Sequence, residues 1–151
     1  MQPFRDGQDK IAQALRTAGI ELLPQVDPTL YCVKAAAAVV RAIAANAGLP
    51  LDQLDRRGRL AASVFGFAAS DSLSVLLGAP FYVVSSIVPL ELFGPGYAGE
   101  LPAVSQAYAR LTKQSKVAKV LGDVIDQWVV DPSEKNLSRL GQLFLLWRNF
   151  A

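Results

Sequence analysis

The clearest pattern in the chain is a run of small and apolar residues over positions 30–47, which includes four consecutive alanines. Alanine has the highest helix propensity of the amino acids, so this composition favours a helix. Asp27 and Pro28 precede the run, an acid at the N-cap position and a proline at the first helical position. Gly48 follows it and is placed for a left-handed C-terminal cap. The pattern predicts a helix from Leu30 to Ala47.

A second start signal lies near the C-terminus, in the sequence Asp131-Pro132-Ser133-Glu134. We interpret Asp131 as the N-cap, Pro132 as the first helical residue, and Glu134 as the residue whose carboxylate reaches back in a capping box. Apolar residues then recur at steps of three and four, which is the spacing of one helix face. This pattern predicts a final helix over residues 134–148.

The final helix carries more apolar residues than one face requires. Leu145 and Leu146 lie outside the main stripe, so more than one side of the helix needs cover. Two explanations fit: the helix is central in the fold, or another subunit covers it. Under the second explanation the interface residues are Leu143, Leu145, Leu146, Trp147 and Phe150.

Two further segments show helical periodicity. A short amphipathic helix is expected around Ile11 and Leu15, with its end near Gly19. A longer helical pattern begins at Pro102 and extends to about residue 129. Polar residues interrupt its apolar face, so we expect a bend or break near Thr112 to Lys116, with a polar contact inside an unbroken helix as the alternative.

Residues 60–99 hold only two charged side chains, Asp71 and Glu91, where an even spread of charge would place about seven. Positions 72–90 are uncharged, a length close to the roughly 20 residues that cross a bilayer as a helix. Prolines and glycines interrupt this run, so we expect a broken or hairpin arrangement. Two explanations stay open: burial in a membrane or an assembly interface, and an ordinary soluble core in which residues 81–88 form a short helix or a strand.

The two acids of this stretch and its glycine turn have structural interpretations. We expect Asp71 to cap a helix N-terminus and Glu91 to be solvated near the following turn. Residues 94–99 match the pattern G-x-G-x-x-G, but a proline occupies the tight turn and no second strand with a ribose-binding acid is evident. We therefore expect a glycine-proline loop there and no cofactor.

Composition narrows the chemistry that the chain can perform. The 151 residues are 52% apolar and 19% charged, which fits one helical domain over residues 1–151. Histidine is absent and Cys32 is the single cysteine. Imidazole catalysis, an intrachain disulfide and zinc sites built from these residues are therefore excluded. Since no pattern assembles a nucleophile, a base and an oxyanion donor, we expect no enzyme activity and no metal.

Charge points to a local basic function. The net charge of +2 is too small for the positive field of a dedicated nucleic-acid binder, so nucleic acid is not an expected partner. Arg56, Arg57 and Arg59 precede the charge-poor stretch and are candidates for contact with anionic lipid or another anion. The alternative is a solvated loop in which Asp52 and Asp55 partly neutralise the arginines. The polar N-terminus lacks the pattern of a signal peptide, which favours the cytoplasm or the cytoplasmic side of a membrane.

Together these patterns predict an all-α protein, a helical bundle of about five segments with a charge-poor centre broken by proline and glycine. The expected function is that of a non-enzymatic structural or assembly subunit, associated with a membrane or packed against other protein subunits of the same or a different chain. The alternative is a soluble helical module that binds a small apolar ligand or a partner helix.

Overall fold

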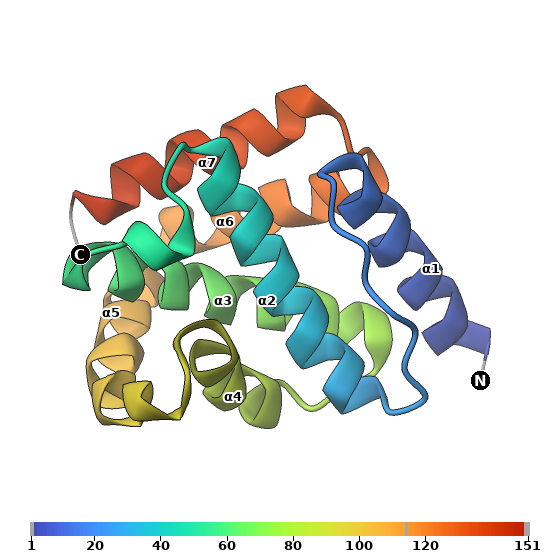
Figure 1. Ribbon diagram of the computed structural model, residues 1–151, viewed down its shortest axis with the longest axis horizontal. Coiled ribbons are helices and arrows are strands. Elements are labelled where there is room, and N and C mark those ends of the chain that lie inside the picture. The colour runs from blue at the N-terminus through green and yellow to red at the C-terminus, as the bar shows by residue number, and fades with distance from the viewer. Residues whose placement is uncertain (1, 114, 150–151) are drawn as a thin grey trace.

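The computed structural model describes residues 2–113 and 115–149 and builds them from seven α-helices (Figure 1). These are α1 (Gln2–Thr17), α2 (Pro28–Asn46), α3 (Arg56–Leu77), α4 (Phe81–Phe93), α5 (Leu101–Lys113), α6 (Ser115–Val130) and α7 (Glu134–Arg148), joined in part by the 3-10 helices η1 (Leu51–Gln53) and η2 (Pro95–Glu100). No strand occurs within the described part of the chain, so the all-α prediction is confirmed. The expected number of about five helical segments is too low.

Both ends of α2 follow the local signals of the sequence. Asp27 is the N-cap residue, and its Oδ1 accepts a hydrogen bond from the backbone N–H of Thr29 at 2.9 Å. Pro28 is the first helical residue, a position where its missing N–H has no intrahelical partner to lose. Gly48 adopts a φ of 75° beyond the last turn, as the left-handed C-terminal cap requires. The predicted helix is confirmed.

Helix α3 begins earlier than the sequence suggested and continues through Asp71. Its N-cap is Asp55, whose Oδ1 accepts a hydrogen bond from the N–H of Gly58 at 2.8 Å. The predicted cap at Asp71 is wrong, because this residue is exposed inside a helix of 22 residues that no proline interrupts. The helix ends at Gly78, whose φ of 68° is a left-handed conformation that glycine reaches without strain.

Helix α3 lies at the centre of the fold and packs against α1, α2, α4, α5, α6 and α7. Figure 1 shows α2 crossing in front of it, α7 above it and α4 below it. Small side chains allow these close approaches, since Ala61, Ala69 and Ser70 are fully buried. At Gly66, an added Cβ would lie only 2.9 Å from Cγ1 of Val88 on α4. The chain's own helices therefore cover most of α3.

Two helices, α2 and α3, are long and apolar enough to cross a membrane by length and composition. In each of them 67% of the apolar window is buried inside the fold, which is the pattern of a core helix. The charge-poor stretch forms a helical hairpin, in which residues 78–80 join α3 to α4. The alternative of a strand at residues 81–88 is wrong, because these positions belong to α4.

Helix α7 covers residues 134–148, as predicted, but its N-cap is Ser133 and not Asp131. The Oγ of Ser133 accepts a hydrogen bond from the N–H of Asn136 at 3.2 Å. The backbone carbonyl of Asp131 instead accepts one from the Asn136 side chain at 2.9 Å. The predicted capping box is wrong because Pro132 lies before the helix, which makes Glu134 its first residue.

The long helical pattern after Pro102 is divided into α5 and α6. Helix α5 ends at Lys113 and α6 begins at Ser115, within the expected region of a break. Gln114, which lies between them, is outside the described residues. The two helices run in different directions in Figure 1, so the second helix packs against α3 beside α7.

Candidate functional site

A cleft of about 610 Å³ opens where the second half of α2, η1, the start of α3, the end of α4 and η2 meet. We call it the arginine cleft. Its lining residues are Arg41, Leu51, Asp52, Arg56, Arg59, Leu92, Phe93, Gly96, Tyr97 and Glu100. Of the three predicted anion-contact residues, Arg56 and Arg59 line the cleft, whereas Arg57 is exposed outside it.

Two guanidinium groups of the cleft are oriented by backbone carbonyls. Nη1 of Arg59 donates a hydrogen bond to the carbonyl oxygen of Leu54 at 3.2 Å. Nη2 of Arg41 donates one to the carbonyl oxygen of Glu91 at 3.4 Å. Within residues 2–113 and 115–149, neither arginine forms an ion pair with a carboxylate. Since a guanidinium has five N–H donors, most donors of both groups are open to another partner.

The acids near the cleft neutralise it only in part. Nη2 of Arg56 lies 3.5 Å from Oε2 of Glu100, and Asp52 also lines the cleft. The third nearby acid, Asp55, is used to cap α3, and the hydrogen bond from the Gly58 N–H is the main reason why its pKa is lowered. The lining therefore carries three positive and two negative side chains.

Two aromatic rings form an apolar wall of the cleft. The ring centroids of Phe93 and Tyr97 are 5.0 Å apart, and both side chains are half-buried. Burial raises the pKa of Tyr97, against a smaller lowering by a hydrogen bond with Ser63, so the phenol is protonated at neutral pH. Residues 94–99 form a turn and a 3-10 helix that follow α4. A helix thus stands where a dinucleotide fingerprint requires a strand.

The outer face of α4 is mainly apolar, and Ser86 is its exposed polar residue. Tyr82, Val83 and Ile87 point away from the core and are 85%, 45% and 39% exposed. The inner face is apolar as well, since Val84 and Val88 are fully buried. Apolar side chains therefore occupy both the core side and the water side of this helix.

An ion pair joins α4 to α2. Nζ of Lys34 lies 2.6 Å from Oε1 of Glu91, and both side chains are half-buried, so Glu91 is not the solvated residue that we expected. Leu30 lies one turn before Lys34 on the same side of α2, and Ile87 lies one turn before Glu91 on the same side of α4. Because Lys34 and Glu91 are paired, Leu30 and Ile87 belong to the same surface. Leu30 is also exposed. We define the α4 face as Leu30, Tyr82, Val83 and Ile87.

The predicted interface residues of α7 are divided between two sides of the helix. Leu143 and Trp147, which lie one turn apart, are half-buried and pack against the core. Leu145 and Leu146 are 40% and 56% exposed. Phe150 lies outside the described residues. Among the described residues of this set, Leu145 and Leu146 are therefore the two that are exposed to a partner.

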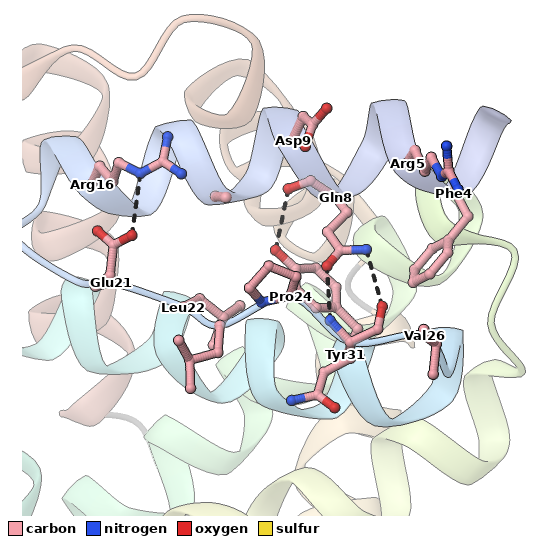
Figure 2. Close-up of a pocket in the computed structure, with 13 residues that line it drawn as sticks. Phe4, Arg5, Gln8, Asp9, Arg16, Glu21, Leu22, Pro24, Val26 and Tyr31 are labelled. Atoms are coloured by element: carbon pink, nitrogen blue, oxygen red, sulfur yellow. Dashed lines mark hydrogen bonds and ion pairs between the residues drawn. The ribbon is translucent and has the colours of Figure 1, made fainter. Parts of the chain in front are cut away.

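A hollow of about 590 Å³ lies between α1 and the segment of residues 18–27 (Figure 2). Gln8 fastens this segment to α1: its Nε2 donates to the carbonyl oxygen of Gln25 at 3.2 Å, and its Oε1 accepts from the N–H of Gln25 at 2.9 Å. The hydroxyl of Tyr31 donates to the carbonyl oxygen of Gln8 at 3.1 Å. Burial, with Asp9 nearby, raises the pKa of Tyr31 to about 12. These polar groups satisfy one another, so their role is structural.

A further hollow, of about 490 Å³, has an acidic rim formed by Asp71, Asp123 and Asp126, with Lys10 beside them. Burial raises the pKa of Asp126, a hydrogen bond with Ser72 opposes this effect, and the other two aspartates add to it. In the part of the chain that the structure describes, no group of three potential ligands is arranged to hold a metal ion. The rim is an acidic surface without metal-site geometry.

Sequence reasoning missed Arg41 and the aromatic wall of the cleft. Arg41 is the single charge in the apolar run of α2 after Lys34, and it follows Lys34 by seven residues, or about two helical turns. This spacing could have indicated a polar stripe on α2. Phe93 and Tyr97 carry no comparable signal, because they flank a turn whose direction the sequence does not give.

Comparisons with known proteins identify no relative of this chain. No protein-family model matches the chain, and the searches of curated proteins and of solved structures found no match. The contacts, charges and exposed surfaces described above are therefore the basis for a function.

Proposed function

We propose that the chain is a non-enzymatic assembly subunit that forms a homodimer through the α4 face. The observation that supports this proposal is the exposure of apolar side chains on the outer side of α4. A surface helix of a globular protein normally turns an apolar face to the core and a polar face to water. In α4 the water side carries Tyr82, Val83 and Ile87, with Ser86 as its exposed polar residue, so the solvent-facing side of this helix is mainly apolar.

The charges beside the face favour a second copy as the partner. Lys34 and Glu91 border the face and are paired with each other, so the face has no net charge that would require an oppositely charged partner. A neutral apolar face can meet its own copy across a two-fold axis, where both subunits contribute the same residues. Dimers of this symmetry are also the commonest homo-oligomers.

The size of the face predicts weak association. The 13 residues of α4 span about 20 Å, and a standard interface covers about 800 Å² on each partner. Full burial of one valine or isoleucine side chain contributes about 1.5–3 kcal/mol, and the entropy lost on association offsets much of the sum. We therefore expect a reversible dimer that dissociates at micromolar concentrations.

Sedimentation velocity tests the proposal at protein concentrations from about 1 µM to about 500 µM. Val83→Asp places a charge in the α4 face. Val75→Asp is the matched control, because Val75 is also an exposed helical valine but lies on α3 at the acidic hollow. We expect the wild type and Val75→Asp to dimerise equally, and Val83→Asp to remain monomeric.

Three results contradict the proposal. A wild-type monomer over the whole concentration range excludes the homodimer. A dimer that Val83→Asp leaves intact places the interface elsewhere on the chain. Binding of monomeric wild type, but not of Val83→Asp, to vesicles of phosphatidylcholine and phosphatidylserine assigns the α4 face to a membrane surface.

A further inference from the structure

We infer that the arginine cleft binds a phosphate monoester whose organic group contains a planar ring, as in an aryl phosphate or a nucleoside monophosphate. This inference does not depend on the homodimer. The cleft is lined by the C-terminal end of α4, at Leu92 and Phe93. The α4 face is formed by Leu30 of α2 and by three residues among the first seven of α4. The two proposals can therefore fail separately.

The guanidinium groups of Arg41 and Arg59 supply the binding site for the anion. They come from two different helices and line the same cleft. Because a backbone carbonyl already orients each of them, binding does not have to immobilise two free side chains. A guanidinium binds phosphate oxygens at two points through its planar fork of N–H donors. An anion thus provides the partner that no carboxylate of the described chain provides for these two groups.

The position of the arginine cluster is unfavourable for the stability of α3. Arg56, Arg57 and Arg59 lie in the first turn, where the Asp55 carboxylate at the N-cap is the one acid against three basic side chains. The N-terminus of a helix carries a partial positive charge, so acidic side chains are favoured there and basic ones are disfavoured. Natural proteins break one or two local rules of this kind at functional sites. An anion bound between Arg41 and Arg59 offsets the repulsion at the start of α3.

The two acids of the cleft leave it positively charged. Glu100 forms an ion pair with Arg56. In the rest of the lining, the negative charge of Asp52 therefore faces the two positive charges of Arg41 and Arg59. The remaining net charge of the lining attracts an anion at neutral pH. Because the cleft is open to solvent, added salt is expected to screen this attraction.

The remaining lining favours a ring over a bare ion. A volume of about 610 Å³ falls in the usual range of small-molecule sites, about 300–1,000 Å³, and exceeds the space that a phosphate group fills. Phe93 and Tyr97 provide aromatic surface, and Leu51 and Leu92 provide aliphatic surface. A Cβ added at Gly96 would meet no described atom within 4 Å. A planar ring can therefore lie against this wall and stack on an aromatic or guanidinium plane.

Isothermal titration calorimetry with phenyl phosphate tests the anion site, with inorganic phosphate as the probe that lacks a ring. Arg41→Gln and Arg59→Gln are each expected to weaken phenyl phosphate binding by about tenfold or more. Arg57→Gln is the matched control, because it removes the same charge from the same helical turn but outside the cleft. Its expected effect is less than about twofold.

The aromatic wall is tested by the difference between the two probes. We expect phenyl phosphate to bind at least about tenfold more tightly than inorganic phosphate, because its ring is removed from water. Tyr97→Leu is expected to reduce this ratio and to leave the affinity for inorganic phosphate unchanged. Equal affinities for the two probes in the wild type would exclude a site for the ring.

Other results overturn either the anion site itself or the proposed ligand. If Arg57→Gln and Arg59→Gln weaken binding equally, the arginines act only as diffuse surface charge. If the wild type binds vesicles that contain phosphatidic acid but does not bind phenyl phosphate, the phosphate comes from a lipid headgroup.

Arg59→Gln also loses the hydrogen bond to Leu54, so its unfolding temperature is compared with that of the wild type. Arg41→Gln is a second test of the anion site. The hydrogen bond that it removes is exposed to solvent, so its loss is expected to change the unfolding temperature little.

Discussion

Replacement of Gly66 by alanine measures how closely α3 and α4 are packed. A Cβ at this position would lie 2.9 Å from Cγ1 of Val88, with side-chain atoms of Val40 and Leu92 at 3.9 Å. Carbon atoms in contact normally lie about 3.5–4.0 Å apart. Val88 is fully buried, so its side chain cannot turn into solvent. Helix α4 must therefore move by several tenths of an ångström to admit the methyl group.

Two effects of opposite sign act on this variant. Alanine is favoured over glycine inside a helix by about 0.8–1.0 kcal/mol, whereas overpacking a core costs about 1–3 kcal/mol. Gly122→Ala isolates the first effect, because the nearest described atom to a Cβ there is Oγ of Ser72 at 4.0 Å. We expect Gly122→Ala to raise the free energy of unfolding by about 0.5–1 kcal/mol. Gly66→Ala should lie about 1–3 kcal/mol below it.

Urea unfolding followed by far-UV circular dichroism gives the free energy of unfolding of both variants. For a domain of this size, a difference of about 2 kcal/mol corresponds to about 4–8 °C in Tm, so a thermal scan provides an independent check. The reasoning is refuted if Gly66→Ala and Gly122→Ala gain the same stability. That result would mean that the contact between α3 and α4 has room for a methyl group.

Three further predictions follow from the caps and the buried ionisable groups. Ser133→Ala should lower the free energy of unfolding by about 0.5–2 kcal/mol, and Asp131→Ala should lower it less, because Ser133 is the N-cap of α7. Burial raises the pKa of Cys32 to about 11, so at about pH 8 its thiol should react with Ellman's reagent only after unfolding in urea. Tyr31 ionises near pH 10 when unfolded and at a pKa of about 12 when folded. The stability present below pH 10 should therefore fall as the pH rises toward 12, and the fall should be smaller in Tyr31→Phe.

Capping residues and prolines in the sequence predicted a helix end correctly where the residue could occupy only one position in a helix. The pair Asp27-Pro28 can cap and begin a helix but cannot continue one, and α2 begins there. The same pair at Asp131-Pro132 did not locate the start of α7, because a second capping residue, Ser133, follows it. Asp71 has two available roles, since an aspartate can cap a helix or lie exposed within it. The choice depends on whether the preceding residues are helical, and the start at Asp55 makes them so. Long-range packing of α3 against six other helices stabilises this extended helix.

Arg56, Arg57 and Arg59 were predicted as one cluster, because the sequence shows that they are close along the chain but does not show the direction in which each side chain points. Once α3 is placed from Arg56 onward, helix geometry divides the cluster. Arg56 and Arg59 are three residues apart and share a face, whereas Arg57 is rotated by about 100° from Arg56. The contribution of Arg41 depends on α2 and α3 folding against each other, which no local pattern encodes.

Glu91 links the two proposed binding surfaces. Its side chain holds Lys34 beside the α4 face, and its carbonyl oxygen accepts the hydrogen bond that orients Arg41 in the cleft. A partner that displaces the last turn of α4 therefore changes the position of a phosphate-binding group. Such coupling must be reciprocal, so phenyl phosphate at saturating concentration should change the dissociation constant of the homodimer. Sedimentation velocity with and without phenyl phosphate measures this effect, and an unchanged constant would show that Arg41 and the α4 face act independently.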